Sequence, residues 1–358
     1  MHVQDDLLLI REQLYRLTET AYFENALNDH ARDVIALIDH VAPRVDGMPD
    51  LIAYELRRQI WTDHQHLNGS TSNEIPYEIV HVLTRALRSW IDDRDVLVTT
   101  ALLDEPAFYF TRGLRWPGIA KLLPEFEQPR RPYTLVQISL PRLYRTYPLR
   151  CAPLFHELAH YLDDTVNVSD EFILQARFTD VGPGRDLQRR YMREHFADLF
   201  SACYLGETIV HDIMRLNNVN GATRTHPDPS YRIEVVQAFL AGRTHRVVDQ
   251  FNAILQERGL PSLHTRFALP DVAAAFDDIR PCSIASDQEL YGIFPAAQAY
   301  LAEILEDRRP SWSDWSRQSA NRTINDLVEK SIRNMDLKEK WRNAAMEQVG
   351  HTAQSELK

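Results

Sequence analysis

The chain has 358 residues, of which 44% are hydrophobic and 25% charged, and its formal net charge is −11. This composition is typical of a soluble globular protein, and the length suffices for two or more packed lobes. The acidic balance disfavours nucleic acid as a partner, since a nucleic-acid interface needs clustered positive charge. No apolar run reaches the roughly 18 residues of a membrane-spanning helix, so no membrane span is expected.

The three cysteines, Cys151, Cys203 and Cys282, are widely spaced and form neither a disulfide framework nor a CxxC metal knuckle. The N-terminal segment MHVQDDLLLIREQLYRL lacks the basic start, long apolar run and cleavage site of a secretory signal. Together these features predict a protein of the reducing cytoplasm.

The first part of the chain is predicted to be helical. Apolar side chains recur at three- and four-residue steps over residues 5–42, 48–61 and 78–91, with a polar loop at 66–74. We therefore expect a helical N-terminal lobe over residues 1–91.

Three short segments then change the character of the sequence. Residues 94–103, 106–114 and 133–143 are rich in Val, Thr, Tyr and Phe and are separated by Pro, Gly and charged residues. This pattern predicts the strands of a small sheet.

Helical patterns return after residue 148. Residues 186–206 predict a long helix that ends at Gly206, and a further helix begins at Ser286, which forms a capping box with Glu289. Residues 323–348 predict a charged amphipathic helix. The expected fold class is α+β, mainly α, with a small sheet, a core over residues 92–245 and a helical region over 246–358.

The segment FHELAHYLDD (155–164) carries the pattern H-E-x-x-H as His156, Glu157 and His160. Residues four apart lie on one face of a helix, so both imidazoles can reach one ion. Zinc favours such nitrogen ligands, and Glu157 can act as the base for a metal-activated water. The alternative is a surface helix with two ordinary histidines, but the apolar flanking residues argue for burial.

The later segment REHFADLFSACYLG supplies a third ligand and its support. Glu194 and Asp198 lie one helical turn apart among apolar residues. Glu194 can complete the coordination, and Asp198 can accept the free ring N–H of a ligand histidine. The alternative reading is a charged helix face.

The pair of motifs His156-Glu157-x-x-His160 and Glu194-x-x-x-Asp198 resembles the gluzincin class of zinc metallopeptidases. The resemblance implies a zincin-like catalytic core over residues 92–245 with one zinc ion per chain. It also implies that an edge strand, 134–141 or 96–103, holds an extended peptide.

The segment THPDPSYRIEVV (225–236) resembles a stretch of the M48-like peptidases. By that resemblance His226 donates a hydrogen bond to the developing oxyanion, with Tyr231 as the alternative donor, and Arg232 holds the loop or Asp198. The alternative is a turn built by Pro227 and Pro229.

The sequence thus predicts a soluble zinc metallopeptidase that acts on a protein or peptide substrate. Two alternatives stay open: a non-proteolytic zincin-like binding or regulatory module, and a latent protease whose helical flanks bind a regulatory protein partner or block the cleft.

Three segments allow either a functional or a plain surface interpretation. The insertion between His160 and Glu194, with its loop 181–184, is either a gate over the cleft or a surface loop. The basic segments RGLRWPGIAK (112–121) and EQPRRPYT (127–134) either bind an acidic partner or substrate segment or are solvated loops.

Overall fold

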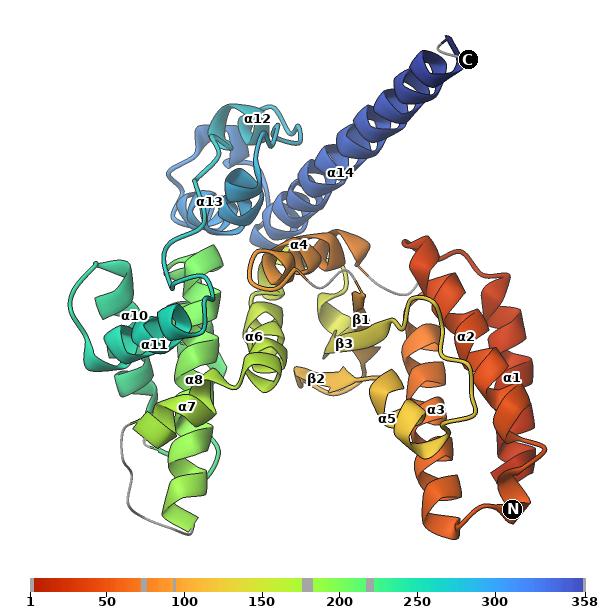
Figure 1. Ribbon diagram of the computed structural model, residues 1–358. Coiled ribbons are helices and arrows are strands. Elements are labelled where there is room, and N and C mark those ends of the chain that lie inside the picture. The colour runs from red at the N-terminus through yellow and green to blue at the C-terminus, as the bar shows by residue number, and fades with distance from the viewer. Residues whose placement is uncertain (1–2, 72–75, 93–94, 176–182, 217–221, 357–358) are drawn as a thin grey trace. The chain divides into compact units, whose positions relative to one another are not determined.

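The computed structural model describes residues 3–71, 76–92, 95–175, 183–216 and 222–356 (Figure 1). Over these ranges the chain is mainly helical and holds one three-stranded sheet. The predicted fold class, α+β and mainly α with a small sheet, is therefore confirmed. Within the same ranges, no helix has the length and apolar character needed to cross a lipid bilayer.

The chain forms two compact units. Unit 1 comprises Met1–Arg145 together with His160–Thr165, and unit 2 comprises Thr146–Ala159 together with Val166–Lys358. One helix, α6 (Pro153–Val166), contributes residues to both. The division into three parts, residues 1–91, 92–245 and 246–358, stays a prediction.

Unit 1 begins with amphipathic helices, as the sequence predicts. Their bounds are α1 Val3–Thr18, α2 Asn25–Val41, α3 Asp50–Gly69 and α4 Tyr77–Arg88. In α2 the buried positions Leu27, Ala31, Val34 and Ile38 follow the three- and four-residue spacing. They join a core that continues to Leu135 of the sheet, so the helices and the sheet share one hydrophobic interior.

The sheet of unit 1 consists of β1 (Val96–Leu103), β2 (Tyr109–Arg112) and β3 (Thr134–Pro141), and a short helix, α5 (Trp116–Leu122), follows β2. The strand order is β1-β3-β2, with β1 parallel and β2 antiparallel to β3. All three predicted strands are present.

The central position of β3 corrects one expectation. The sequence predicts either 134–141 or 96–103 as the edge strand that holds a peptide, but β3 pairs with β1 on one side and β2 on the other. Over residues 136–139, where both neighbours pair with β3, the strand has no backbone groups left for a peptide. In the described part of the sheet the edges are β1 and β2.

Unit 2 is built around a long helix, α8 (Pro183–Leu205). Other helices of the unit are α7 Val168–Gln175, α9 Thr208–Leu216, α10 Pro229–Leu240 and α11 Arg246–Glu257. Phe196, Phe200 and Tyr204 of α8 are fully buried. The predicted C-cap is confirmed, because Gly206 has φ of +57° and the ring of Phe267 lies where a side chain would project.

The C-terminal part of unit 2 contains α12 (Ala273–Asp277), α13 (Asp287–Leu305) and α14 (Arg317–Glu356). The predicted cap of α13 is confirmed, because the Ser286 side chain accepts a hydrogen bond from the Glu289 backbone N–H. Asn325 of α14 accepts a hydrogen bond from the Leu149 N–H at 3.0 Å, which links α14 to the segment that precedes α6 within this unit.

Two predicted loops differ from the structure. The loop expected at 66–74 begins later, because α3 continues to Gly69. In the insertion between His160 and Glu194, α7 forms over Val168–Gln175, and residues 183 and 184 belong to the first turn of α8. Residues 181 and 182 of the predicted gating loop lie outside the described residues.

Candidate metal centre

Helix α6 presents three polar side chains from an otherwise buried segment. Pro153 is its first residue, a position where the missing N–H of proline costs no hydrogen bond. The apolar residues from 154 to 162 are buried: Leu154, Phe155, Leu158, Ala159, Tyr161 and Leu162. His156, Glu157 and His160 are each partly exposed. The helix is therefore anchored by its apolar side chains, and solvent reaches only its polar positions along this stretch.

The three polar side chains converge at one place. One ligand atom from each of His156, Glu157 and His160 lies within 4.8 Å of the other two. The spacing of four residues on one continuous helix accounts for the approach of the two imidazoles. The group includes Glu157, for which the sequence predicts the role of base and not of ligand.

Helix α8 brings two carboxylates to His156 inside unit 2. Glu194 Oε2 lies 3.3 Å from His156 Nε2, and Asp198 Oδ1 lies 3.1 Å from His156 Nδ1. Both carboxylates are buried, at 8% and 1% exposure. Each ring nitrogen of His156 therefore faces its own carboxylate.

Arg232 of α10 holds Asp198 in place. Its Nε and Nη2 donate to the two carboxylate oxygens of Asp198, both at 2.7 Å. The same guanidinium lies 3.5 Å from Glu194 Oε2. Such a bidentate pair fixes the carboxylate in the plane of the guanidinium. The orientation of Asp198 then sets the direction from which it accepts a hydrogen bond from His156.

Burial and charge act against each other in this cluster. Burial alone lowers the pKa of His156, but the hydrogen bonds and charges of Asp198 and Glu194 outweigh burial and raise that pKa to about 10. Burial acts to raise the pKa of Asp198, but Arg232 and His156 lower it to about 2. The carboxylates thus favour positive charge at the His156 ring.

The donor set fits a divalent zinc ion. Zinc in proteins takes imidazole nitrogens and carboxylate oxygens, and a ligand histidine commonly donates its second N–H to a carboxylate. His156 has that arrangement, with Asp198 at Nδ1 and Glu194 at Nε2. A bound ion would supply the positive charge that the two carboxylates otherwise stabilise as a proton on the His156 ring. The same donors also suit other divalent transition metals.

His226 lies in the loop before α10 and faces the same carboxylate. Its Nε2 is 3.5 Å from Glu194 Oε2, and its side chain is 45% exposed. Burial is the main cause that lowers its pKa, which favours the neutral ring. A neutral, partly exposed imidazole beside Glu194 can donate a single hydrogen bond toward the open side of the site.

Two contacts of this loop were not foreseen from the sequence. Thr225 Oγ1 lies 2.8 Å from His226 Nδ1, and the Tyr191 hydroxyl of α8 donates to the Thr223 carbonyl at 2.7 Å. Together they fix the ring of His226 and attach its loop to α8. The only signal in the sequence was the position of Thr225 directly before His226, since Tyr191 has no motif spacing.

The predicted alternative donor, Tyr231, has a different environment from His226. Its ring packs edge-on against His195 with the centroids 5.2 Å apart, and it is 42% exposed. In unit 2 the structure therefore brings together His156, Glu194, Asp198, Arg232 and His226. Glu157 and His160 join His156 along α6.

Comparison of the chain with protein-family models, curated proteins and solved structures found no match. The resemblance to gluzincins rests on the residues of the two motifs.

Proposed function

We propose that this protein is a zinc-dependent metallopeptidase of the gluzincin type, with zinc held by His156, His160 and Glu194. The observation that carries the proposal is the setting of His156, whose two ring nitrogens face Glu194 and Asp198 at 3.3 and 3.1 Å. A histidine that only packs in a core does not need two carboxylates. The proposal includes a protein or peptide substrate and a cytoplasmic location.

Zinc, when bound, would polarise the substrate carbonyl and lower the pKa of a water molecule. The protein's own groups carry the remaining steps. Glu157 takes the proton from the attacking water on its carboxylate and delivers it to the leaving amine. His226 donates a hydrogen bond to the oxyanion that develops on the carbonyl. Asp198, held by Arg232, fixes the ring orientation and tautomer of His156.

The division of roles between the two glutamates follows from their surroundings. Glu194 is buried and lies within 3.5 Å of Arg232, so it is held in one place. Glu157 is partly exposed on the surface of α6, where water and substrate have access. A fixed carboxylate suits a ligand, and an accessible one suits a base.

The test separates metal binding from chemistry. Purified protein is expected to bind one zinc per chain. Glu157→Gln keeps the zinc but loses peptidase activity by about 10²–10⁴-fold, the usual contribution of a general base. His156→Ala and Glu194→Gln lose the zinc as well. Zinc content by mass spectrometry and cleavage of a proteome-derived peptide library provide the two measurements.

Other outcomes favour the alternatives. A protein that binds no stoichiometric metal contradicts the proposal outright. Stoichiometric zinc without cleavage of any peptide or protein favours a zincin-like binding or regulatory module. Activity that rises when limited proteolysis removes the helical flanks favours a latent protease controlled by a regulatory partner.

A further inference from the structure

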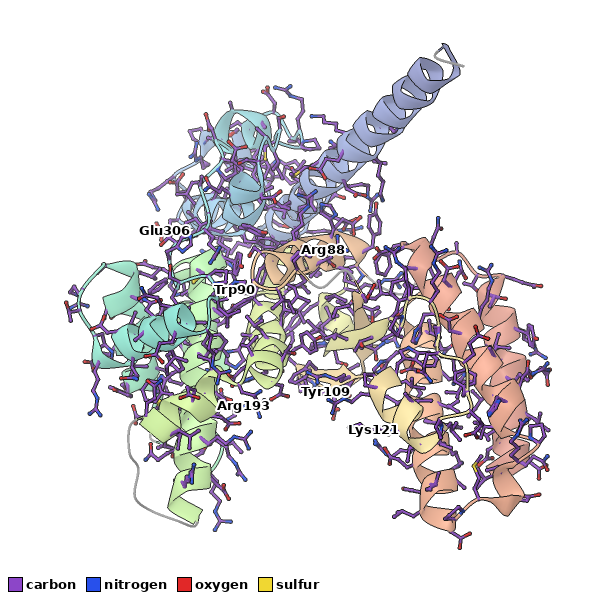
Figure 2. All side chains as sticks on the ribbon, viewed as in Figure 1. Arg88, Trp90, Tyr109, Lys121, Arg193 and Glu306 are labelled. Atoms are coloured by element: carbon purple, nitrogen blue, oxygen red, sulfur yellow. The ribbon has the colours of Figure 1, made fainter. Side chains whose placement is uncertain are left out.

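Unit 1 contains a polar pocket whose lining residues take no part in the proposed metal binding or hydrolysis. It encloses about 460 Å³ and is lined by residues of α3, of the end of β2 and of α5. Four of its charged side chains are basic, namely Arg58, Arg112, Arg115 and Lys121, and one, Glu55, is acidic. Figure 2 shows Lys121 on α5 and Tyr109 at the first residue of β2.

The single carboxylate of this pocket is already engaged. Glu55 accepts hydrogen bonds from Arg58 at 2.7 and 2.9 Å and from Gln59 at 2.7 Å. The charges of Glu55 and Arg58 therefore cancel. Three positive charges remain, those of Arg112, Arg115 and Lys121.

None of these three cations has a carboxylate within ion-pair distance among the residues that the structure describes. Arg112 interacts with two neutral groups: its guanidinium lies 4.8 Å from the ring centroid of Tyr161, and its Nη2 donates to Thr165 Oγ1 at 3.2 Å. On a chain of net charge −11, this pocket is a local concentration of unneutralised positive charge. An anionic group is the chemical complement of such a pocket.

The pocket also lies close to one of the proposed zinc ligands within unit 1. Phe110, two residues before Arg112 on β2, stacks on the His160 ring with the centroids 6.5 Å apart and an angle of 28°. Two residues of a strand span about 7 Å. Arg112 additionally touches Tyr161, the residue after His160. The pocket thus begins at Arg112, two residues along β2 from the side chain that stacks on His160.

We propose that this pocket binds an acidic side chain of the peptide substrate, about two residues from the scissile bond. The inference rests on the proposed peptidase function. An extended peptide that pairs with the edge strand β2 keeps the spacing of that strand, so a side chain two residues from the bond at His160 reaches Arg112. The guanidinium groups of Arg112 and Arg115 can each form bidentate hydrogen bonds with a carboxylate, and Lys121 adds a third positive charge.

The first test is a cleavage measurement with the zinc-loaded full chain. Peptide pools are compared that hold either Glu or Gln at one fixed position and are otherwise identical. We expect the Glu pool to be cleaved about tenfold better in kcat/KM, because a hydrogen bond between a charged donor and a charged acceptor is stronger than one to a neutral amide. The preference is expected at a position two residues from the new terminus.

Matched variants locate the preference. Arg115→Gln with Lys121→Gln is expected to reduce the Glu preference to near one, because both exposed side chains line the pocket and neither touches α6 in a described contact. Arg130→Gln is the control: it removes one exposed positive charge of unit 1 outside the pocket and keeps the preference. Equal cleavage of both pools, or a preference that survives the double substitution, overturns the inference.

A binding measurement distinguishes failure of this inference from failure of the proposed function. Fluorescence anisotropy of the same pools is measured on Glu157→Gln protein, in which binding does not require hydrolysis. If neither pool is cleaved but the Glu pool binds more tightly and depends on Arg115 and Lys121, the peptidase proposal fails and the anion pocket stands. If both pools are cleaved and bound equally, the peptidase stands and the pocket inference fails.

Discussion

Each unit contains a histidine held by an aspartate, and the two pairs differ in what surrounds them. In unit 1, His30 Nε2 lies 2.6 Å from Asp63 Oδ2, and both side chains are fully buried. In unit 2, His156 lies 3.1 Å from Asp198, but the imidazole is 12% exposed and also faces Glu194. The His–Asp pair of unit 1 is shielded from solvent, whereas the imidazole of the pair in unit 2 is partly accessible.

The partners of the two aspartates explain the difference. The second oxygen of Asp63 accepts from the Leu114 backbone N–H at 2.5 Å, and a side chain at position 113 would collide with that oxygen, so Gly113 permits the approach. Asp63 thus ties α2 and α3 to the segment after β2. Asp198 is instead held by Arg232 and directs a histidine toward an accessible site. The first pair connects elements, and the second orients a potential ligand.

The pKa values of His66 and His156 shift in opposite directions, and for different reasons. Burial lowers the pKa of His66, next to the unit 1 pair, to about 4, so a proton is excluded there. The carboxylates around His156 outweigh its burial and raise its pKa to about 10. Burial therefore disfavours a positive charge at His66, whereas the carboxylates favour one at His156.

The largest expected effect tests whether the unit 1 pair is structural. Asp63→Ala leaves His30 and the Leu114 N–H without their acceptor in a buried place, so we expect the free energy of unfolding to fall by about 3–5 kcal/mol. Urea denaturation measures it. Asp39→Ala is the control, because Asp39 pairs with Arg11 at the surface and should cost at most about 1 kcal/mol. Equal effects for both variants would contradict the structural role of Asp63.

A smaller effect should appear on acidification. The pKa of His66 is about 4 in the folded chain against an ordinary 6.5, so between these values the unfolded chain binds more protons and stability rises with pH. The full contribution is present above pH 6.5, and about 2 kcal/mol of it is lost between pH 7.5 and pH 5. Wild-type protein and His66→Gln are compared by urea unfolding at both pH values.

The variant should show a pH dependence that is weaker by that amount. His264→Gln, a change at an exposed histidine, should keep the dependence of the wild-type protein. If His66→Gln and the wild type lose stability in parallel, His66 is not excluded from protonation in the folded chain.

A third effect, comparable in size to the second, separates the two aspartates by metal binding. Asp198→Asn removes the charge that His156 Nδ1 and Arg232 share, and we expect zinc affinity to fall about 10–100-fold. Asp63→Asn should leave zinc affinity unchanged. Competition with a chromophoric chelator measures both. A comparable loss in Asp63→Asn would mean that zinc affinity reports general stability and not a dedicated site.

Part of the candidate site can be predicted from the sequence, because the relative positions of these side chains depend on the geometry of a single helix. The spacing of His156 and His160 fixes their approach through the helical repeat, and Glu194 and Asp198 share a face of α8 for the same reason. The edge position of β2 could not be read from the chain, because strand order depends on packing between segments.

The unit 1 pair was missed, although its signal was present. His30 follows Leu27 by three residues, and Asp63 follows Ile60 by three, so both occupy core positions of amphipathic helices. A polar residue at a core position requires a buried partner. That partner lies 33 positions away, and only folding decides which one it is.

Local periodicity and backbone conformation suffice to predict the helices, the caps at Gly206 and Ser286, and the grouping of chemically suitable side chains on α6 and α8. Folding is needed to establish which ring nitrogen of His156 faces which carboxylate and that Arg232 holds Asp198. The physical reason is that hydrogen-bond partners are selected by distance and direction across separate elements, which no local pattern encodes.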